Sequence, residues 1–252
     1  MVESSLKIGW AEADITPQRP VSISGNFSPR ISEGIADPLN TTVWAVESEG
    51  EQAIFVSCDL VVISEELCEA IRTRVAAQGT DIDPEKIIIH ATHTHYAPET
   101  RPSRVSVDRI GIPLQEISED IMTVEEYLAF ASTRVANAIE EAWSKRAPGG
   151  MAYGMDYAVI GRNRRWVNEQ GKGTMHGLNA STADHFRYIE GFEDHALYLV
   201  ATYDADSKLT GLVINFACPA QVPGQKSSYE ISADVWHEAR QELRRRFGNE
   251  VF

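Results

Sequence analysis

The chain has 252 residues, of which 43% are hydrophobic and 24% are charged, and its formal net charge at pH 7 is −14. This composition is typical of a globular protein, and the acidic charge disfavours nucleic acid and anionic lipid surfaces as partners, because their phosphates would repel it. The three cysteines, at positions 58, 68 and 218, lack the regular spacing of a disulfide framework.

The hydrophobic residues are not gathered into a run long enough to cross a bilayer, and the N-terminus lacks the basic start and apolar core of a signal peptide. We therefore expect a cytoplasmic protein with no integral membrane segment. The length is sufficient for a full hydrophobic core, and we expect residues 1–252 to form a single α/β domain.

The first part of the sequence predicts a strand, a hairpin, a helix and a further strand. The first strand covers 6–13, and the hairpin joins 41–48 to 53–62 through Glu49-Gly50-Glu51. Ser64 can cap a helix whose buried face carries Leu67, Ile71 and Val75. Gly79 would end this helix. This order favours parallel pairing of the flanking strands, and so an α/β fold with mixed β-sheet layers and flanking helices.

The second part of the sequence begins with a long polar stretch, 99–120, which is too long for a passive connection and which we interpret as a site-covering loop. Thr123-Val124-Glu125-Glu126 has the form of a capping box that starts a long helix. After Pro148-Gly149-Gly150 we expect a strand at 151–159, an irregular segment at 161–190, a hairpin of 197–203 with 211–217, and a last helix at 234–247.

The sequence Ile87-Ile88-Ile89-His90-Ala91-Thr92-His93-Thr94-His95 is the most informative motif of the chain. In an extended backbone alternate side chains share a face, so we expect His93 and His95 to point the same way at the end of a buried strand. Two converging imidazoles favour a transition-metal site, and the alternative is a pair of hydrogen-bonded structural histidines. His90 has the opposite parity, and we expect it to pack in the core.

Two carboxylates are further candidates for the same site. Asp59 ends the strand that is expected beside the histidine strand, where it could bind a metal or orient an imidazole; the alternative is a loop-capping role. Asp234 precedes the last helix and could be its N-cap or a substrate-binding residue, and His237 lies one turn into that helix. Gln221 could bind substrate but is a poor metal ligand.

Arg162, Arg164 and Arg165 form a cationic group in an acidic chain. A guanidinium suits a carboxylate or a developing oxyanion, and Arg164 is our candidate for that catalytic role, with ion pairing to the many acids as the alternative. Cys218 is a further possible metal ligand, although a lone buried cysteine is usually inert.

Several segments together resemble the neutral/alkaline (non-lysosomal) ceramidase family. They are Gly9-Trp10-Ala11-Glu12-Ala13-Asp14-Ile15-Thr16-Pro17, Val56-Ser57-Cys58-Asp59, Ala91-Thr92-His93-Thr94-His95, Gly161-Arg162-Asn163-Arg164-Arg165, Asn215-Phe216-Ala217-Cys218-Pro219 and Ile231-Ser232-Ala233-Asp234. The ATHTH and ADITP segments are fairly specific in combination and weak singly. After ATHTH, Tyr96-Ala97 stands where the family usually has Ser-Gly.

The resemblance implies a zinc amidase that cleaves an N-acyl amide, with this chain as the N-terminal region of a longer catalytic domain. It makes His93 a zinc ligand, His95 the neighbouring catalytic histidine and Arg164 a site arginine. The family's second ligand histidine belongs near Ala217–Ala220, where this chain has none. Its Glu and Tyr ligands and its serine nucleophile lie further along than Phe252.

The function that these observations predict is metal-dependent hydrolysis of an amide or related acyl bond in a small-molecule or lipid-like substrate. One alternative is a non-catalytic binding module, or a fragment that needs a C-terminal half for activity. Another is an amidohydrolase-type metal barrel, which the order of strands fits poorly. Homo-oligomerisation is left open by the sequence.

Overall fold

The computed structural model describes residues 6–26, 30–102, 120–175, 183–221 and 228–252. The chain divides into two compact units: the first comprises Met1–Ala152, Ala201–Leu212 and Ala220–Phe252, and the second Tyr153–Val200 and Val213–Pro219. The chain passes from one unit to the other within the strands Ala147–Tyr157, Ala196–Asp204 and Leu209–Phe216, and again between Pro219 and Ala220. The single domain that we expected from the sequence stays a prediction.

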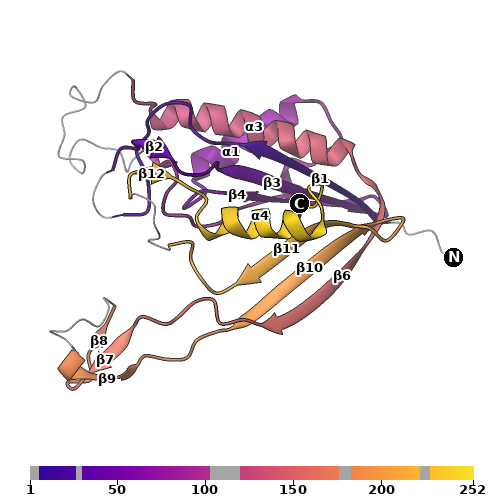
Figure 1. Ribbon diagram of the computed structural model, residues 1–252. Helices are drawn as coiled ribbons and strands as arrows, with labels where there is room; N and C mark the ends of the chain where they lie inside the picture. Colours follow the sequence, from indigo (N-terminus) through magenta and orange to yellow (C-terminus); the bar gives the residue numbers. More distant parts are fainter. Residues whose placement is uncertain (1–5, 27–29, 103–119, 176–182, 222–227) are drawn as a thin grey trace. The chain divides into compact units, whose positions relative to one another are not determined.

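The largest sheet is mixed (Figure 1), and its strand order is β11-β10-β6-β1-β3-β4-β5; β1, β3, β4 and β5 lie wholly in the first unit. Strand β1 pairs antiparallel with β3, β3 pairs antiparallel with β4, and β4 pairs parallel with β5, as the strand-helix-strand order predicted. The α/β class is therefore confirmed. The strands are β1 (Leu6–Asp14), β3 (Asn40–Ser48), β4 (Glu51–Cys58), β5 (Ile87–Ala91), β6 (Ala147–Tyr157), β10 (Ala196–Asp204) and β11 (Leu209–Phe216).

Helices α1 (Glu65–Ala77) and α3 (Val124–Ser144) pack together and share the core with β1, β3 and β4. The expected caps are present: Ser64 Oγ accepts from the Leu67 N–H at 3.2 Å, and Thr123 and Glu126 form the capping box. Gly9 allows α3 to lie close to β1, since a Cβ there would come within 1.9 Å of the Ala142 carbonyl oxygen.

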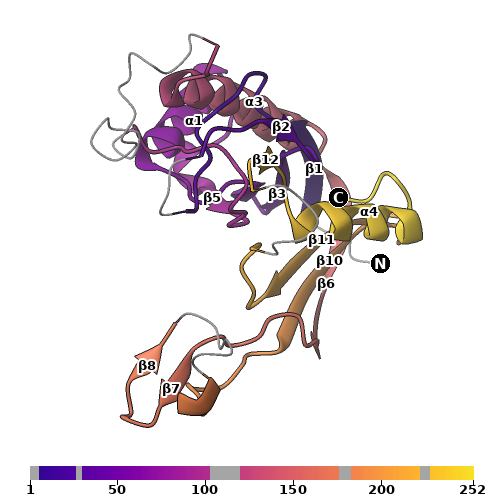
Figure 2. The ribbon, with the colours of Figure 1, turned by 60° about the vertical axis from the view of Figure 1, so that its left-hand side comes forward.

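Helix α4 (Val235–Phe247) lies on the opposite face of the sheet from α1 and α3 (Figures 1 and 2). It is tied to that face through Arg244, whose Nη2 donates to Glu12 Oε2 at 2.6 Å, and through Arg240, which pairs with Asp59. The first loop is the connection between β1 and β3. A short parallel pair, β2 (Gly34–Ile35) with β12 (Glu230–Ile231), brings the segment before α4 beside this loop.

The second unit contains a small antiparallel sheet of order β8-β7-β9, where the sequence indicated an irregular segment. Its strands are β7 (Trp166–Asn168), β8 (Gly173–Thr174) and β9 (Phe186–Ile189), and a 3-10 turn, Ala183–His185, precedes β9. The strands are too short to show a clear alternation, which explains why sequence reasoning missed them.

Other sequence predictions differ from the structure mainly at element ends. Strand β4 stops at Cys58 instead of residue 62, and β5 stops at Ala91, before the two histidines. Most of the expected covering loop, 103–119, lies outside the described residues. His90 is exposed on the edge strand β5, so its expected core packing is wrong. Within the described residues, no helix is both long and apolar enough to span a membrane.

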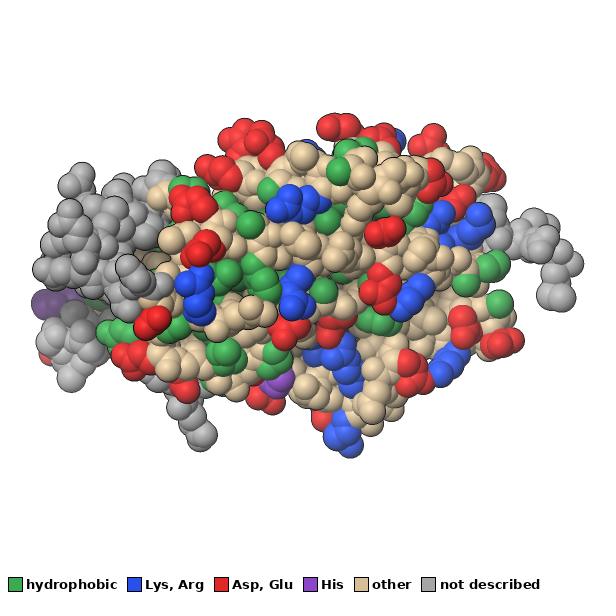
Figure 3. All heavy atoms as spheres, turned by 90° about the horizontal axis from the view of Figure 1, so that it is seen from above, with side chains coloured by type: hydrophobic (Ala, Val, Ile, Leu, Met, Phe, Trp, Pro, Cys, Tyr) green, Lys and Arg blue, Asp and Glu red, His purple; other side chains and the backbone are tan. Residues whose placement is uncertain are grey.

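The face seen in Figure 3 carries acidic and basic side chains interspersed, without a broad area of positive charge. An interspersed surface of this kind lacks the basic stripe by which proteins track a phosphate backbone. That face therefore offers no argument for nucleic-acid binding.

Candidate active site

The two histidines lie in the loop that follows β5, beside the loop that follows β4. Parallel neighbours end at the same edge of a sheet, so these two loops meet there: Thr92 N–H donates to the Cys58 carbonyl and His93 N–H to the Leu60 carbonyl, each at 2.9 Å. His93 has a φ of 64°, in the left-handed region that non-glycine residues rarely adopt. The expected extended backbone through His93 is therefore wrong.

The imidazoles of His93 and His95 nevertheless converge. Their Nε2 atoms are 3.2 Å apart, and the ring centroids lie 4.8 Å apart with the planes at 76°. A backbone turn at His93, rather than strand alternation, aims the two rings at each other. His93 is exposed and His95 is half-buried, so the pair opens towards solvent on one side.

Hydrogen bonds determine which ring nitrogens carry protons. His93 Nδ1 lies 2.8 Å from the Val61 carbonyl oxygen, which can only accept, so Nδ1 carries the proton and Nε2 has a free lone pair. The Gln221 amide N lies 2.6 Å from His95 Nε2 and 2.9 Å from His95 Nδ1, and His95 Nε2 lies 3.2 Å from His93 Nε2. Gln221 thus contacts the predicted site directly.

Asp59 does not share a cluster with the histidine rings. It is fully buried, and its carboxylate pairs with both terminal nitrogens of Arg240 at 2.7 and 2.8 Å. It also accepts from the Asn40 N–H at 2.8 Å and from Thr92 Oγ1 at 3.2 Å. With its acceptor positions used in this way, Asp59 anchors the loop that carries His93, which is close to the loop-capping alternative, and metal binding by Asp59 stays a prediction.

Asp234 is the N-cap of α4, the plain role that the sequence offered: its carboxylate accepts from the Val235 N–H at 2.5 Å. Asp234 is also buried. The segment just before it contacts the histidine loop, because Thr94 Oγ1 donates to the Ser232 carbonyl at 2.7 Å. His237 is half-buried in the first turn of α4. Substrate binding by Asp234 and His237 stays a prediction.

Arg164 and Cys218 belong to the second unit. Arg164 is exposed, and within the described ranges it forms no ion pair or hydrogen bond, unlike Arg165, which pairs with Glu190. Cys218 Sγ lies 3.5 Å from the Pro219 carbonyl. The catalytic role of Arg164 stays a prediction.

Two residues that sequence reasoning missed touch His95. Gly25 has a φ of 89°, and a Cβ there would lie 2.6 Å from His95 Cγ, so only glycine allows the backbone to lie against the ring. Arg30 donates to the His95 carbonyl at 2.8 Å. The Ser24-Gly25 turn could have indicated a close approach, whereas no local pattern marks Arg30.

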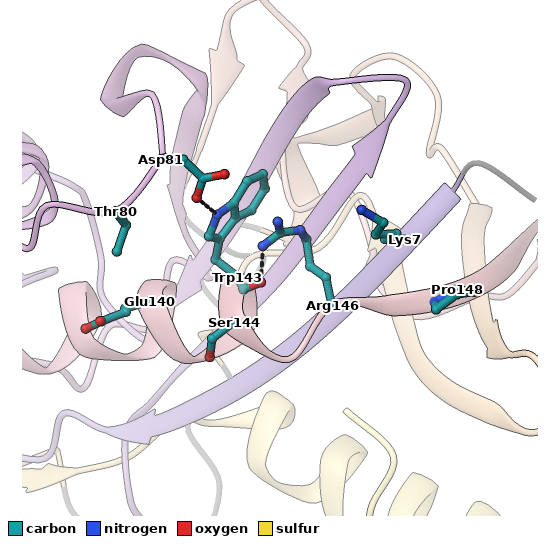
Figure 4. A pocket seen from close by; sticks show the side chains of 8 residues that line it. All are labelled: Lys7, Thr80, Asp81, Glu140, Trp143, Ser144, Arg146 and Pro148. Carbon is teal, nitrogen blue, oxygen red and sulfur yellow. Dashed lines mark hydrogen bonds between the residues drawn. The ribbon is translucent and has the colours of Figure 1, made fainter.

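The first unit has a separate hollow of about 470 Å³ (Figure 4). Its lining includes Lys7 near the start of β1, residues of α3 and the loop residues Thr80 and Asp81. Trp143 forms its floor, with its indole N–H donating to Asp81 at 2.6 Å and the Arg146 guanidinium over its ring. No predicted site residue lines this hollow, so it gives no support to the sequence-based site.

Solved structures provide the comparison that decides the fold. The crystal structure of the neutral ceramidase from Pseudomonas aeruginosa superposes with a TM-score of 0.72 at 18% identity, over 98% of this chain and 37% of that one. The fold is that of the neutral ceramidases. A ceramidase complexed with C2 gives a TM-score of 0.71 at 19% identity, over 97% of this chain and 36% of that one.

The chain thus spans little more than a third of the length of these ceramidase structures. No family model and no curated protein matches the sequence. At 18–19% identity the likeness establishes the ceramidase fold alone, and chemistry must be argued from the residues of this chain.

The residues fit part of the zinc site that the ceramidase resemblance implies. Two imidazole nitrogens bound to one tetrahedral zinc, each at about 2.0–2.1 Å, lie about 3.3–3.4 Å apart, close to the 3.2 Å between the Nε2 atoms here. The Val61 carbonyl on His93 Nδ1 is the kind of outer partner that metal-bound histidines have. Among the described residues, however, no three His, Cys, Asp or Glu side chains cluster as a metal site.

Proposed function

We propose that this chain is part of a ceramidase-like, metal-dependent hydrolase that cleaves an amide or related acyl bond. The observation that carries the proposal is the imidazole pair in the loop after β5, presented on a ceramidase fold with the two Nε2 atoms 3.2 Å apart. His93 and His95 would hold zinc, with further ligands from outside the described cluster. Bound zinc would polarise the scissile carbonyl and lower the pKa of a water to about 7.

The chain's own residues would divide the remaining work. His93 Nε2 is presented as an acceptor because its Nδ1 proton is committed to Val61. The Gln221 amide reaches the edge of the His95 ring and could donate to a substrate oxygen after a small rotation. Arg164, which is exposed and unpaired within the described ranges, is available to stabilise a developing negative charge.

The proposed substrate is an N-acyl amide, either a small soluble one or a lipid-like one. We also propose a cytoplasmic location, with nucleic acid excluded as a partner by the net charge of −14. Two observations favour a second candidate, a non-catalytic module or a part that needs a complementing half: the described residues lack a third ligand, and the chain spans 37% of a ceramidase. Turnover of a panel of N-acyl compounds by the 252-residue chain separates the two.

The direct test is metal content, measured by plasma emission spectrometry on protein purified without chelators. We expect stoichiometric zinc in the wild type and its loss in His93→Ala. The matched control is His90→Ala, which removes an exposed imidazole from the same strand without touching the pair. Wild-type protein that stays metal-free after incubation with zinc and dialysis contradicts the metal-dependent function.

A further inference from the structure

Arg30 is a buried cation without a carboxylate partner. Arg30 is only 6% exposed, and burial lowers the pKa of its guanidinium. In the described part of the chain it forms no ion pair; its guanidinium carbon lies 5.8 Å from the centroid of the Tyr96 ring, and its Nε atom has no hydrogen-bond partner. Burying a charge without a counter-charge is costly unless hydrogen bonds satisfy its donors, so the partners of this guanidinium matter.

The guanidinium donates instead to three backbone carbonyls from three separate segments. Nη2 reaches the Ser24 carbonyl at 2.6 Å and the His95 carbonyl at 2.8 Å, while Nη1 reaches the Ser228 carbonyl at 2.7 Å. The planar fork of an arginine suits this arrangement, because its donors point in fixed, divergent directions. Arg30 therefore joins the first loop, the histidine loop and the segment before β12 at one point.

The first loop and the segment that ends at Gln221 also contact His95. Gly25, next to Ser24, lies against the ring; the Gln221 amide N lies 2.6 and 2.9 Å from its two ring nitrogens; and the Ala220 carbonyl accepts from the His95 N–H at 3.3 Å. With its carbonyl held by Arg30 and its N–H by Ala220, the His95 backbone has little freedom to rotate. The contacts of Gly25 and Gln221 with the ring then limit its rotation, and it faces His93.

We propose that Arg30 is a positioning residue, which holds the His95 peptide so that the His95 imidazole faces His93. The importance of that orientation for catalysis rests on the proposed hydrolase function, whereas the orientation itself does not. Replacing Arg30 releases the His95 carbonyl, so the histidine loop turns and the contact between the two Nε2 atoms opens.

The test uses Arg30→Met, which keeps the apolar stem without the donors, and Arg30→Lys, which keeps the charge but offers one amine for three carbonyls. Arg146→Met is the matched control, because Arg146 is also largely buried, pairs with Glu47 and stacks on Trp143 away from the histidines (Figure 4). The readout is the ring ¹⁵N spectrum of metal-free, histidine-labelled protein, with the His95 signals assigned by His95→Asn.

We expect the His95 ring signals to move to free-imidazole positions in Arg30→Met, to move less in Arg30→Lys, and to stay in Arg146→Met. The His93 Nδ1 signal should persist in all three, since Val61 still accepts from it. Unchanged His95 signals in Arg30→Met overturn the proposal. If that variant does not fold, wild-type His95 signals in folded Arg30→Lys overturn it as well.

Kinetics on an N-acyl substrate then separate this inference from the proposed function. We expect kcat of Arg30→Met to fall about 10–100-fold with KM little changed, the usual effect of removing an outer partner of a site residue. Absence of turnover in the metal-loaded wild type contradicts the proposed function only, while the ring spectra still decide the role of Arg30.

Discussion

Removing one partner of the buried ion pair between Asp59 and Arg240 should destabilise this protein far more than removing one partner of a surface pair. Asp59 is fully buried and the Arg240 side chain is 18% exposed, so replacing Arg240 with methionine leaves a carboxylate without its counter-charge in the core. Removing one partner of a buried pair costs about 3–5 kcal/mol. For a chain of this size that lowers Tm by about 6–20 °C.

The assay is thermal unfolding by circular dichroism at pH 7, with urea titration to obtain the free energy of unfolding. Arg245→Met is the matched control on the same helix, because Arg245 pairs with Glu242 on the exposed face and its loss should change Tm little. Arg240→Met with Asp59→Asn should recover part of the loss, since the orphaned charge is removed. A Tm for Arg240→Met equal to that of Arg245→Met would refute the reasoning.

Two further predictions concern the loops around the histidine pair. Burial raises the pKa of Glu99, but the hydrogen bonds from Arg101 and Ser24 and the charge of Arg101 together outweigh it and hold the pKa below its ordinary value. A carboxyl group of this kind stabilises the fold above its unfolded pKa, about 4.3, and loses that contribution as pH falls through the folded pKa, so Tm should decline below about pH 4 more steeply in wild type than in Glu99→Gln. Gly25→Ala should destabilise by more than Gly50→Ala: both have a left-handed φ, 89° and 84°, but only at residue 25 would a Cβ meet the His95 ring. Equal urea midpoints for the two alanine variants would contradict that close contact.

Local patterns in the sequence predicted much of the first unit correctly. Helix α1 has its apolar residues one turn apart and a serine before them, and α3 carries a capping box, so their bounds follow from periodicity and caps. The β1–β3–β4 meander follows from three apolar runs and one tight turn. The three short strands β7, β8 and β9 have two to four residues each, too few for a periodic signal.

The candidate site was predictable only in part, because most of it is not local. The spacing of His93 and His95 indicated a converging pair, although the turn at His93 produces the convergence and the strand has already ended. Asp59 was expected at the metal because of its place at a strand end. Its partner Arg240 lies 181 residues away, and no local pattern could have indicated that pairing.

The contacts that hold His95 also join residues that are far apart in the sequence. Arg30 is 65 residues from His95, Gln221 is 126 residues from it, and Arg30 reaches across 198 residues to Ser228. Each of these contacts closes a long loop, whose entropy cost must be met by the packing of the sheet and its helices rather than by the site. The histidine pair is therefore a consequence of the whole first unit: the loop after β5 supplies the rings, and distant loops, joined at one buried arginine, hold the His95 backbone.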